Sequence, residues 1–539
     1  MNVLLLNLTR FGDLLQSQAA IIDLVRQGHR VGLVCLESFS GAVPLLDGVA
    51  HVASLPGALF LSGLDAAAGK DENGAPGWHT AVAGLSAWRE ELWSAFAPDI
   101  ILNLTPSLSA RLLALFLARG VPGAGYIVDE HGFGVNSNAW AAFLQGASLE
   151  RGVSPFNMVD LFRRVAVPDG PAVPGLSSLR RPPGGSAEAM RLALWEQAPP
   201  ECRGFVALQL GASENRRRWP VASFAQLGDA LWLEEGLCPV ILGSKAEQPL
   251  SERYAEAAAQ PHISLCGKTG LTDLAAVLCE VSLLVTNDTG TMHLAAGLDR
   301  PVLAVFLATA QPFDTGPYRE GSCSVEPDMD CHPCAFGKAC GREEACRRAI
   351  RPELMTALAL SRLRHGQWRT PEFCADDPGA RVWLSRFDEQ GFMSLRSLSG
   401  HGNGNRALWL ELQRHYLRIF LDRKQAGAFK PEPWRRAQGL PKELCEAVRP
   451  AAQTAASLVR LLAQQGRVIS GGRHGHMGDR FLVTWHKIHD LLRASPGFSA
   501  LAVLWAQQTQ AEGKDLPVIL AAIEDFGALL EALVTELHE

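Results

Sequence analysis

Three short segments combine charged side chains with small residues, a pattern typical of loops that bind phosphorylated ligands. The first, 210–220 (LGASENRRRWP), has three consecutive arginines in a chain whose formal net charge is −6. The second is 243–247 (GSKAE), and the third is 286–293 (TNDTGTMH). In the third, Asp288 and Thr289 lead into a predicted helix, and free backbone N–H groups at a helix start attract phosphate. Together the segments predict an anion-binding site that also contains a carboxylate.

Each segment taken alone has a structural explanation. Arginine runs commonly form solvated surfaces, and Asp-Thr-Gly before a helix often serves only as an N-cap. All three segments, however, are expected at the ends of strands of one sheet, where open α/β sheets bind their ligands. Cationic, acidic and helix-start chemistry at one edge favours a binding site over three unrelated loops.

Two further segments carry carboxylates. Residues 9–13 (TRFGD) follow the first predicted strand and end in Asp13. A carboxylate there is suited to accept a proton from a hydroxyl group, or it is a turn residue after Gly12. The triplet 328–330 (DMD) has the pattern of a catalytic metal site, but no strand is predicted before it. We therefore assign no catalytic metal to this triplet.

Five of the twelve cysteines lie between residues 323 and 346. Cys331 and Cys334 have the spacing of a metal knuckle, and Cys340 and Cys346 complete a set of four thiolates. One interpretation is a structural zinc or iron site that fixes a loop beside the ligand. The other is a set of reduced thiols that pack the loop. The remaining cysteines are dispersed, as is typical of small buried apolar residues.

The elements around these segments alternate between buried strands and helices, which predicts parallel α/β sheets. The expected strands form two series: 2–8, 31–36, 51–54, 99–104 and 123–128, and then 205–209, 239–242, 262–265, 282–286 and 302–306. The expected helices between them are 14–27, 84–96, 109–119, 221–235, 246–259, 271–279 and 291–298. Two such units in tandem imply a cleft between them, with ligands beyond the carboxyl ends of the strands.

Length and the change of pattern predict three domains. The first Rossmann-like unit is placed at 1–175, and a linker at 176–200 adjoins the stretch 168–187, which is rich in proline and glycine. The second Rossmann-like unit, with the cysteine-rich loop, is placed at 201–365. The last region, 366–539, shows no strand series and is expected to be all helical. Its helices are expected at 405–422, 442–465, 480–494, 498–511 and 516–537.

Composition narrows the class of protein further. Hydrophobic residues make up 47% of the chain and charged residues 20%, as in soluble globular proteins. The acidic net charge gives no global basic field, so no nucleic-acid partner is expected. Apolar runs are far shorter than the ~20 residues of a membrane span, and Arg10 and Asp13 interrupt the first run too early for a signal peptide. The expected location is the cytoplasm, with at most peripheral contact with the inner membrane.

The sequence resembles glycosyltransferase family 9, the bacterial heptosyltransferases, over about residues 1–355. The matching stretches are LLLNLTRFGDLLQSQAAI, LGASENRRRWPVASFAQL, PVILGSKAE, LCGKTGLTDLAAVL and VTNDTGTMHLAAGLDRPVLAVF. The resemblance implies an α/β GT-B fold, in which two Rossmann-like domains face a cleft. It does not cover the helical domain. It also implies an ADP-heptose donor and an inverting mechanism that requires no metal or other cofactor.

The resemblance assigns roles to individual residues. Asp13 matches the acidic residue proposed as general base, and Arg217 stands where the family usually has lysine. Arginine keeps the positive charge and is able to grip a pyrophosphate with two hydrogen bonds. Glu247 matches the acid that holds the nucleoside of the donor. Further donor-binding positions are Gly211, Ala212, Ser213, Thr269, Asp288, Thr289, Gly290 and His293.

The leading hypothesis is therefore a glycosyltransferase that moves a heptose from ADP-heptose to a hydroxyl group. Its acceptor is a lipopolysaccharide core, another glycolipid or surface glycan, or a protein. Two alternatives are a GT-B enzyme with another nucleotide-sugar donor and a sugar-nucleotide epimerase on a similar scaffold. A third is a nucleotide-sugar-binding protein that catalyses no reaction and whose function is carried by the helical domain.

Overall fold

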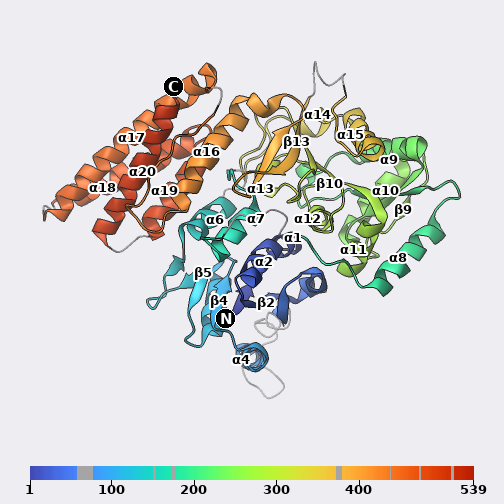
Figure 1. The fold of residues 1–539 in the computed structure, drawn as a ribbon, viewed down its shortest axis with the longest axis horizontal. Coiled ribbons are helices and arrows are strands. Elements are labelled where there is room, and N and C mark those ends of the chain that lie inside the picture. The colour runs from blue at the N-terminus through green and yellow to red at the C-terminus, as the bar shows by residue number, and fades with distance from the viewer. Residues whose placement is uncertain are drawn as a thin grey trace.

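Two α/β units and a helical bundle make up the chain in the computed structural model (Figure 1). The structure describes residues 1–57, 77–149, 153–170, 177–371, 379–436, 439–472, 475–511 and 515–538. The bundle lies at one end of the molecule, next to both α/β units. Among the described helices, none combines the length and the hydropathy needed to cross a membrane.

The first unit is built on a sheet with the strand order β3-β2-β1-β4-β5-β6. All neighbouring strands are parallel except the last pair. The central strand β1 is buried from Val3 to Leu6, as expected for a parallel strand covered on both faces. The strands are β1 (Asn2–Leu6), β2 (Arg30–Leu36), β3 (Val49–Leu55), β4 (Ile100–Asn103), β5 (Gly123–Val128) and β6 (Gly134–Asn136).

The strand order of this sheet reverses between β1 and β4, and a crevice opens beyond the carboxyl ends of strands at such a point. The helix α1 (Phe11–Gln16) leaves β1 there and carries Asp13 in its first turn. Asp13 is thus helical rather than part of a loop, a correction to the interpretation of 9–13. The other helices of the unit are α2 (Gln18–Arg26), α4 (Gly77–Phe96), α5 (Leu108–Ala118), α6 (Ala139–Leu149) and α7 (Met158–Ala166).

The second sheet has the order β14-β13-β12-β11-β10-β7-β8-β9 and reverses between β7 and β10. The predicted segments 210–220 and 286–293 follow β7 and β10, so they flank this reversal. The predicted strands are observed as β7 (Gly204–Gln209), β8 (Leu237–Leu242), β9 (Ile263–Ser264), β10 (Val281–Asn287) and β11 (Val302–Val305). The helices are α9 (Val221–Glu235), α10 (Gln248–Ala257), α11 (Leu271–Glu280), α12 (Gly290–Gly297), α13 (Pro312–Thr315), α14 (Cys346–Ala349) and α15 (Pro352–His365).

Three strands of the second sheet have no counterpart in the sequence analysis. They are β12 (Cys323–Pro327), β13 (Ala380–Phe387) and β14 (Met393–Ser397), and the last two are antiparallel. The region 366–539 is therefore not all helical, because its first strands extend this sheet. In β13 partly buried residues interrupt the buried positions, one of which is Ser385, and in β14 only Met393 is buried, so neither strand forms a continuous apolar run. The expectation that no strand precedes residues 328–330 is likewise wrong, since β12 ends at Pro327.

The stretch between the two units contains a helix, α8 (Gly184–Gln197), where the composition indicated a linker. Its low helix propensity is confined to the first turn, where glycines are tolerated, and its Leu194 is fully buried. The helix packs on α11 of the second unit. Residues 171–176 of the stretch 168–187 lie outside the described residues, as does Cys374, one of the dispersed cysteines.

All five helices predicted for the C-terminal region are confirmed. The helix α16 leads from the second sheet into the bundle, and its Arg406 binds the buried Glu326 of β12. The helix α19 packs on α6 of the first unit so closely that a Cβ atom on Gly146 would lie 2.3 Å from Val503. The bundle thus touches both units. Its helices are α16 (Asn405–Leu421), α17 (Lys442–Ser470), α18 (Met477–Ala494), α19 (Ser499–Ala511) and α20 (Leu516–Glu536).

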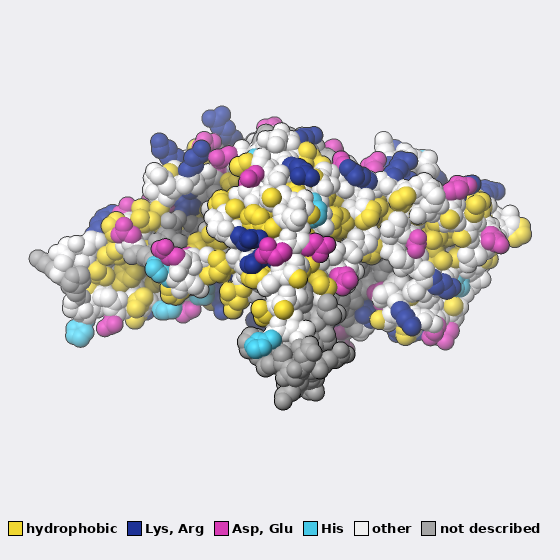
Figure 2. Space-filling view, turned by 90° about the horizontal axis from the view of Figure 1, so that it is seen from below, with side chains coloured by type: hydrophobic (Ala, Val, Ile, Leu, Met, Phe, Trp, Pro, Cys, Tyr) yellow, Lys and Arg dark blue, Asp and Glu magenta, His cyan; other side chains and the backbone are white. Residues whose placement is uncertain are grey.

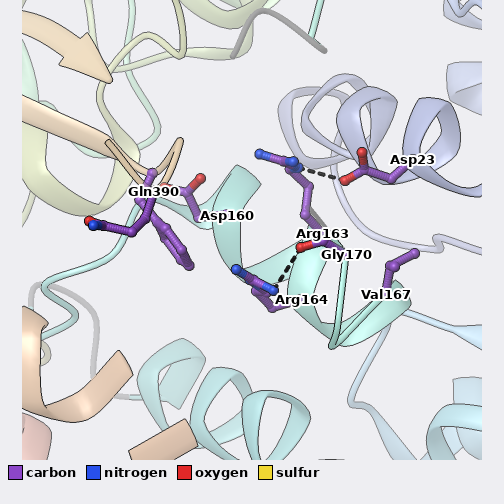
Figure 3. A pocket seen from close by; sticks show the side chains of 8 residues that line it. Asp23, Asp160, Arg163, Arg164, Val167, Gly170 and Gln390 are labelled. Atoms are coloured by element: carbon purple, nitrogen blue, oxygen red, sulfur yellow. Dashed lines mark hydrogen bonds and ion pairs between the residues drawn. The ribbon is translucent and has the colours of Figure 1, made fainter. Parts of the chain in front are cut away.

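The two units and the β13–β14 hairpin meet in a buried polar junction around α7 (Figure 3). Arg163 donates to Asp23 of α2 at 2.7 Å. The carboxylate of Asp160 accepts hydrogen bonds from the Tyr318 hydroxyl at 2.7 Å and from the N–H of Met393 at 3.0 Å. Burial raises the pKa of Asp160 to about 6. The cavity there, of about 10 Å³, has room for about one water. The junction therefore joins the units and is too small for a ligand site.

Candidate functional site

A cleft of about 590 Å³ lies between α1 of the first unit and the strand ends of the second. Its wall contains all the sequence-predicted donor and catalytic positions except Gly211, which lies directly beneath Glu247. The lining residues from the predicted set are Asp13, Ala212, Ser213, Arg217, Glu247, Thr269, Asp288, Thr289, Gly290 and His293. Residues up to 280 positions apart in the sequence (Asp13 and His293, 293 − 13) are thus brought to one cavity.

The two units touch at the cleft through two glycines. A Cβ atom on Gly12 would lie 3.2 Å from Gly290 Cα and 3.2 Å from the His293 ring. A Cβ atom on Gly290 would lie 2.6 Å from the Phe11 ring. Larger residues at either glycine would push α1 and α12 apart. The amino ends of these two helices, one from each unit, therefore meet at the cleft.

Asp13 lies next to this contact, partly exposed to the cleft. In the described part of the chain, no hydrogen bond or ion pair holds its carboxylate. His293 of α12 also lines the cleft, and desolvation lowers its pKa while Asp288 and Asp13 raise it in part. His293 is thus a neutral imidazole near neutral pH.

The start of α12 presents backbone donors to the cleft. Thr289 occupies the N-cap position in an extended conformation but makes no side-chain cap, and instead its hydroxyl lies 3.1 Å from that of Thr286. Thr291 donates to Gln209 at 3.2 Å. The first N–H groups of the helix are therefore left for a ligand, and the helix dipole favours an anion there.

Arg217 lies opposite this helix start, in a short 3₁₀ helix at Asn215–Arg217. One terminal nitrogen of its guanidinium contacts Asp288, and the other donates to Ser213 at 2.9 Å. The Nε atom is buried and has no partner among the described residues. The side chains of Arg217 and Asp288 are 11% and 9% exposed, so the pair is held at the bottom of the cleft. A bound diphosphate would share Arg217 with Asp288.

Glu247 closes the other end of the cleft. Its Oε2 accepts the N–H and the hydroxyl of Ser244, at 2.7 and 2.9 Å. A Cβ atom on Gly211 would lie 1.4 Å from Glu247 Oε1, so only glycine fits at position 211. The carboxylate is thus fixed in one orientation while part of it faces the cavity. Such an acceptor is suited to hold hydroxyl groups of a sugar or nucleoside.

The cysteine-rich loop packs behind the arginine segment. Arg216 donates to the carbonyl of Lys338 at 2.7 Å, and Arg347 donates to the carbonyl of Arg218 at 2.9 Å. The loop therefore supports the backbone that carries Arg217.

The carboxylate of Asp328 is engaged by Arg381 at 2.9 Å and His401 at 3.1 Å, which gives residues 328–330 a structural role.

Four of the cysteines in this loop are free thiols near one another. Burial raises the pKa of Cys334, and Cys331, Cys346 and Cys340 raise it further. Cys340 is exposed, and the N–H groups of Arg342 and Glu344 lower its pKa. Among the described residues, no three His, Cys, Asp or Glu side chains form a group with metal-binding geometry.

The structure adds cleft residues that the sequence analysis did not select. Arg10 and Gln16 come from α1 and its start, and Thr315 comes from α13. Arg10 and Gln16 are in the same opening motif as Asp13, so helical spacing would have indicated them once α1 was recognised as a helix. No local signal points to Thr315.

Comparison with known proteins finds a family match for the side of the cleft that the second unit forms. Residues 186–343 match the model of glycosyltransferase family 9 (heptosyltransferase). Lipooligosaccharide heptosyltransferase 2 of Haemophilus influenzae is 30% identical over 101 residues, 18% of this chain and 29% of that protein. The enzyme of the same name from Campylobacter jejuni is 30% identical over 167 residues, 30% of this chain and 51% of that protein. The chain thus spans about a third to a half of these curated relatives.

The segment that carries the arginines, Glu247 and α12 therefore lies within the part of the chain that matches the glycosyltransferase family 9 model, as the resemblance predicted. Among solved structures, Escherichia coli ADP-heptose lipopolysaccharide heptosyltransferase II is similar with a TM-score of 0.45 and 18% identity, over 60% of this chain and 90% of that one. The predicted architecture of two Rossmann-like domains that face a cleft, followed by a helical region, is confirmed by the strand orders and the bundle.

Proposed function

We propose that the protein is an inverting glycosyltransferase that transfers a heptose from ADP-heptose to a hydroxyl group of a glycolipid, glycan or protein. The observation that carries the proposal is the meeting of Asp13 with the start of α12 and with Arg217 in one cleft. The family match and the heptosyltransferase relatives support the donor class.

The proposed chemistry divides the cleft into two sides. Asp13 accepts the proton of the acceptor hydroxyl as its oxygen attacks the anomeric carbon from the face opposite the leaving group. The bond from that carbon to the diphosphate oxygen breaks, and the nucleoside diphosphate leaves with the electron pair. Arg217 and the N–H groups around Gly290 stabilise the added negative charge. Glu247 holds the nucleoside end.

The test is a coupled measurement of nucleotide release. A thermal-shift screen of nucleotide sugars first identifies the donor, because a ligand of the folded state raises its stability. The proposal requires that nucleoside diphosphate be released only when an acceptor is added. A binding protein would bind donor without release, and an epimerase would change the sugar without any acceptor.

We further propose that this catalysis needs no divalent metal, because Arg217 and α12 supply the positive charge that a metal would otherwise provide. The expected result is that transfer in excess EDTA proceeds at the rate measured with added Mg²⁺ or Mn²⁺. Loss of activity in EDTA, restored by either ion, would contradict this mechanism.

Metal analysis of the purified chain tests the cysteine-rich loop separately: zinc or iron at one equivalent would make it a structural site formed by Cys331, Cys334, Cys340 and Cys346.

We infer that the first unit rests on a membrane surface. The outward face of α5 carries Leu108, Leu112 and Leu115, which are 66%, 49% and 52% exposed and share one helical stripe. The single charged residue of this helix, Arg111, points inward and donates to the carbonyls of Ile127 and Val135. The helix follows β4 and so begins at the sheet edge that holds Asp13. A lipid-linked acceptor would then lie beside the cleft.

The stripe predicts a measurable membrane affinity. The partition coefficient for phosphatidylglycerol-containing vesicles, measured by co-sedimentation, should fall by about 10²–10⁴-fold when Leu112 and Leu115 are both changed to Glu, at about 1.5–3 kcal/mol per leucine. Leu233→Glu on α9, a position that is 69% exposed, is the matched control and should bind as the unchanged chain does. Equal binding by the double variant would remove the inference.

Figure 2 shows charged and hydrophobic side chains intermixed over the underside, with no large basic region among the side chains that the structure describes there.

A further inference from the structure

The side chain of Asn287 connects two of the loops that form the cleft. Asn287 ends β10 and is fully buried. Its Oδ1 accepts the N–H of Trp219 at 2.9 Å, and its Nδ2 donates to the carbonyls of Leu210 and Gly211 at 2.9 and 3.1 Å. All three partners belong to the segment 210–220. One amide group therefore fixes both ends of that segment to the end of β10.

These partners are next to the groups that would touch a donor. Asp288 follows Asn287 directly, and Trp219 is two residues after Arg217. Gly211 leads into Ser213, which accepts a hydrogen bond from Arg217. The Trp219 ring is itself immobile, because it is fully buried and its Nε1 donates to the carbonyl of Ile350 at 2.9 Å. The position of Arg217 relative to Asp288 and α12 is thus set through Asn287.

We propose that Asn287 is a positioning residue that sets donor affinity by holding the arginine segment against the start of α12. This inference rests on the proposed function. The three bonds require one acceptor and two donors on the same side chain, which an amide provides and a carboxylate does not. In Asn287→Asp, a second carboxylate oxygen would face two carbonyl oxygens, and the segment would move away from Asp288.

A matched control exists in the first unit. Asn103 ends β4, is also fully buried, donates to the carbonyl of Tyr126 at 2.8 Å and accepts the N–H of Thr105 at 2.9 Å. It therefore occupies the equivalent place in the other sheet but touches no part of the arginine segment. Asn103→Asp and Asn287→Asp should lower the melting temperature similarly, since both put a carboxylate against a buried carbonyl oxygen.

The experiment is calorimetric titration of each full-length variant with ADP as the probe, at pH 8 and pH 6. Asn287→Asp is expected to weaken ADP binding by about 10–100-fold at pH 8, the equivalent of one hydrogen bond to a charged ligand. Binding should partly recover at pH 6, because a protonated carboxyl regains one donor and a buried carboxyl titrates above its usual range. Asn103→Asp should bind ADP as the unchanged chain does at both pH values.

If Asn287→Asp does not fold, Asn287→Ser replaces it in the experiment, because the serine hydroxyl both donates and accepts a hydrogen bond. The ADP affinity of Asn287→Ser should lie between that of the unchanged chain and that expected for Asn287→Asp. Normal ADP binding by the folded Asn287 variants would overturn the inference alone, as would an equal loss in Asn103→Asp. Absence of ADP binding by the unchanged chain would instead overturn the proposed donor, and the inference with it.

Discussion

Replacing Asp13 by Asn is expected to lower the rate of glycosyl transfer by about 10²–10⁴-fold, the usual contribution of a positioned base. The amide is close to isosteric with the carboxylate but does not accept a proton at neutral pH. The backbone of α1 and its glycine contact with α12 would stay intact, because neither uses the Asp13 carboxylate. Nucleotide affinity should therefore remain close to that of the unchanged chain. Steady-state kinetics and calorimetric titration with ADP measure the two effects separately.

A control for Asp13 lies in the same sheet. Asp99 precedes β4 at the opposite edge, where its carboxylate accepts the N–H of Asn2 at 2.7 Å. Asp99→Asn should leave transfer unchanged and lower only the melting temperature. Transfer by Asp13→Asn at the unchanged rate would remove Asp13 from the mechanism, whatever the fate of nucleotide binding.

Replacing Arg217 by Ala is expected to weaken donor binding and lower kcat together. The guanidinium would contact the diphosphate both before and during departure of the leaving group, so its loss affects both states. Hydrogen bonds to charged groups contribute about 1.5–3 kcal/mol, which predicts about a 10–150-fold weaker affinity for ADP. Arg217→Lys, which restores the charge as a single donor group, should recover part of the loss.

The Arg217 experiment needs a stability control, because Asp288 loses its partner in Arg217→Ala. Melting temperature reports this effect, and an exposed arginine of the same unit, Arg253 on α10, supplies the matched alanine variant. Unchanged ADP affinity in a folded Arg217→Ala protein would contradict the assignment. An equal loss in Arg253→Ala would show that the effect is not specific to the cleft.

The sequence predicts the parallel strands of both sheets and the C-terminal helices because these elements carry strong periodic signals. The buried runs at 3–6 and 283–287 are continuous, and the amphipathic stripes of α17 and α20 extend over many turns. The order of the strands then follows from the reversal typical of doubly wound sheets. That order explains why segments after β1, β7 and β10 meet, although nothing local in Asp13 points to Asp288.

Other features depend on contacts between distant residues and leave no periodic trace. The strand β13 is held by pairing with β12 and contains the partly buried Arg381 and the exposed Arg386, so it lacks an apolar run. The role of Asn287 is similarly invisible, because an asparagine before Asp-Thr-Gly reads as an ordinary loop residue until its three partners are known. The pairing of Arg217 with Asp288 also appears only in three dimensions.

The most direct measurement is a crystal structure of the chain with ADP bound. The account predicts a diphosphate within hydrogen-bonding distance of the N–H groups at Gly290 and Thr291 and of Arg217, with the terminal phosphate directed toward Asp13. Adenosine should lie near Glu247. A nucleotide bound away from the start of α12, or with its terminal phosphate turned from Asp13, would contradict the account.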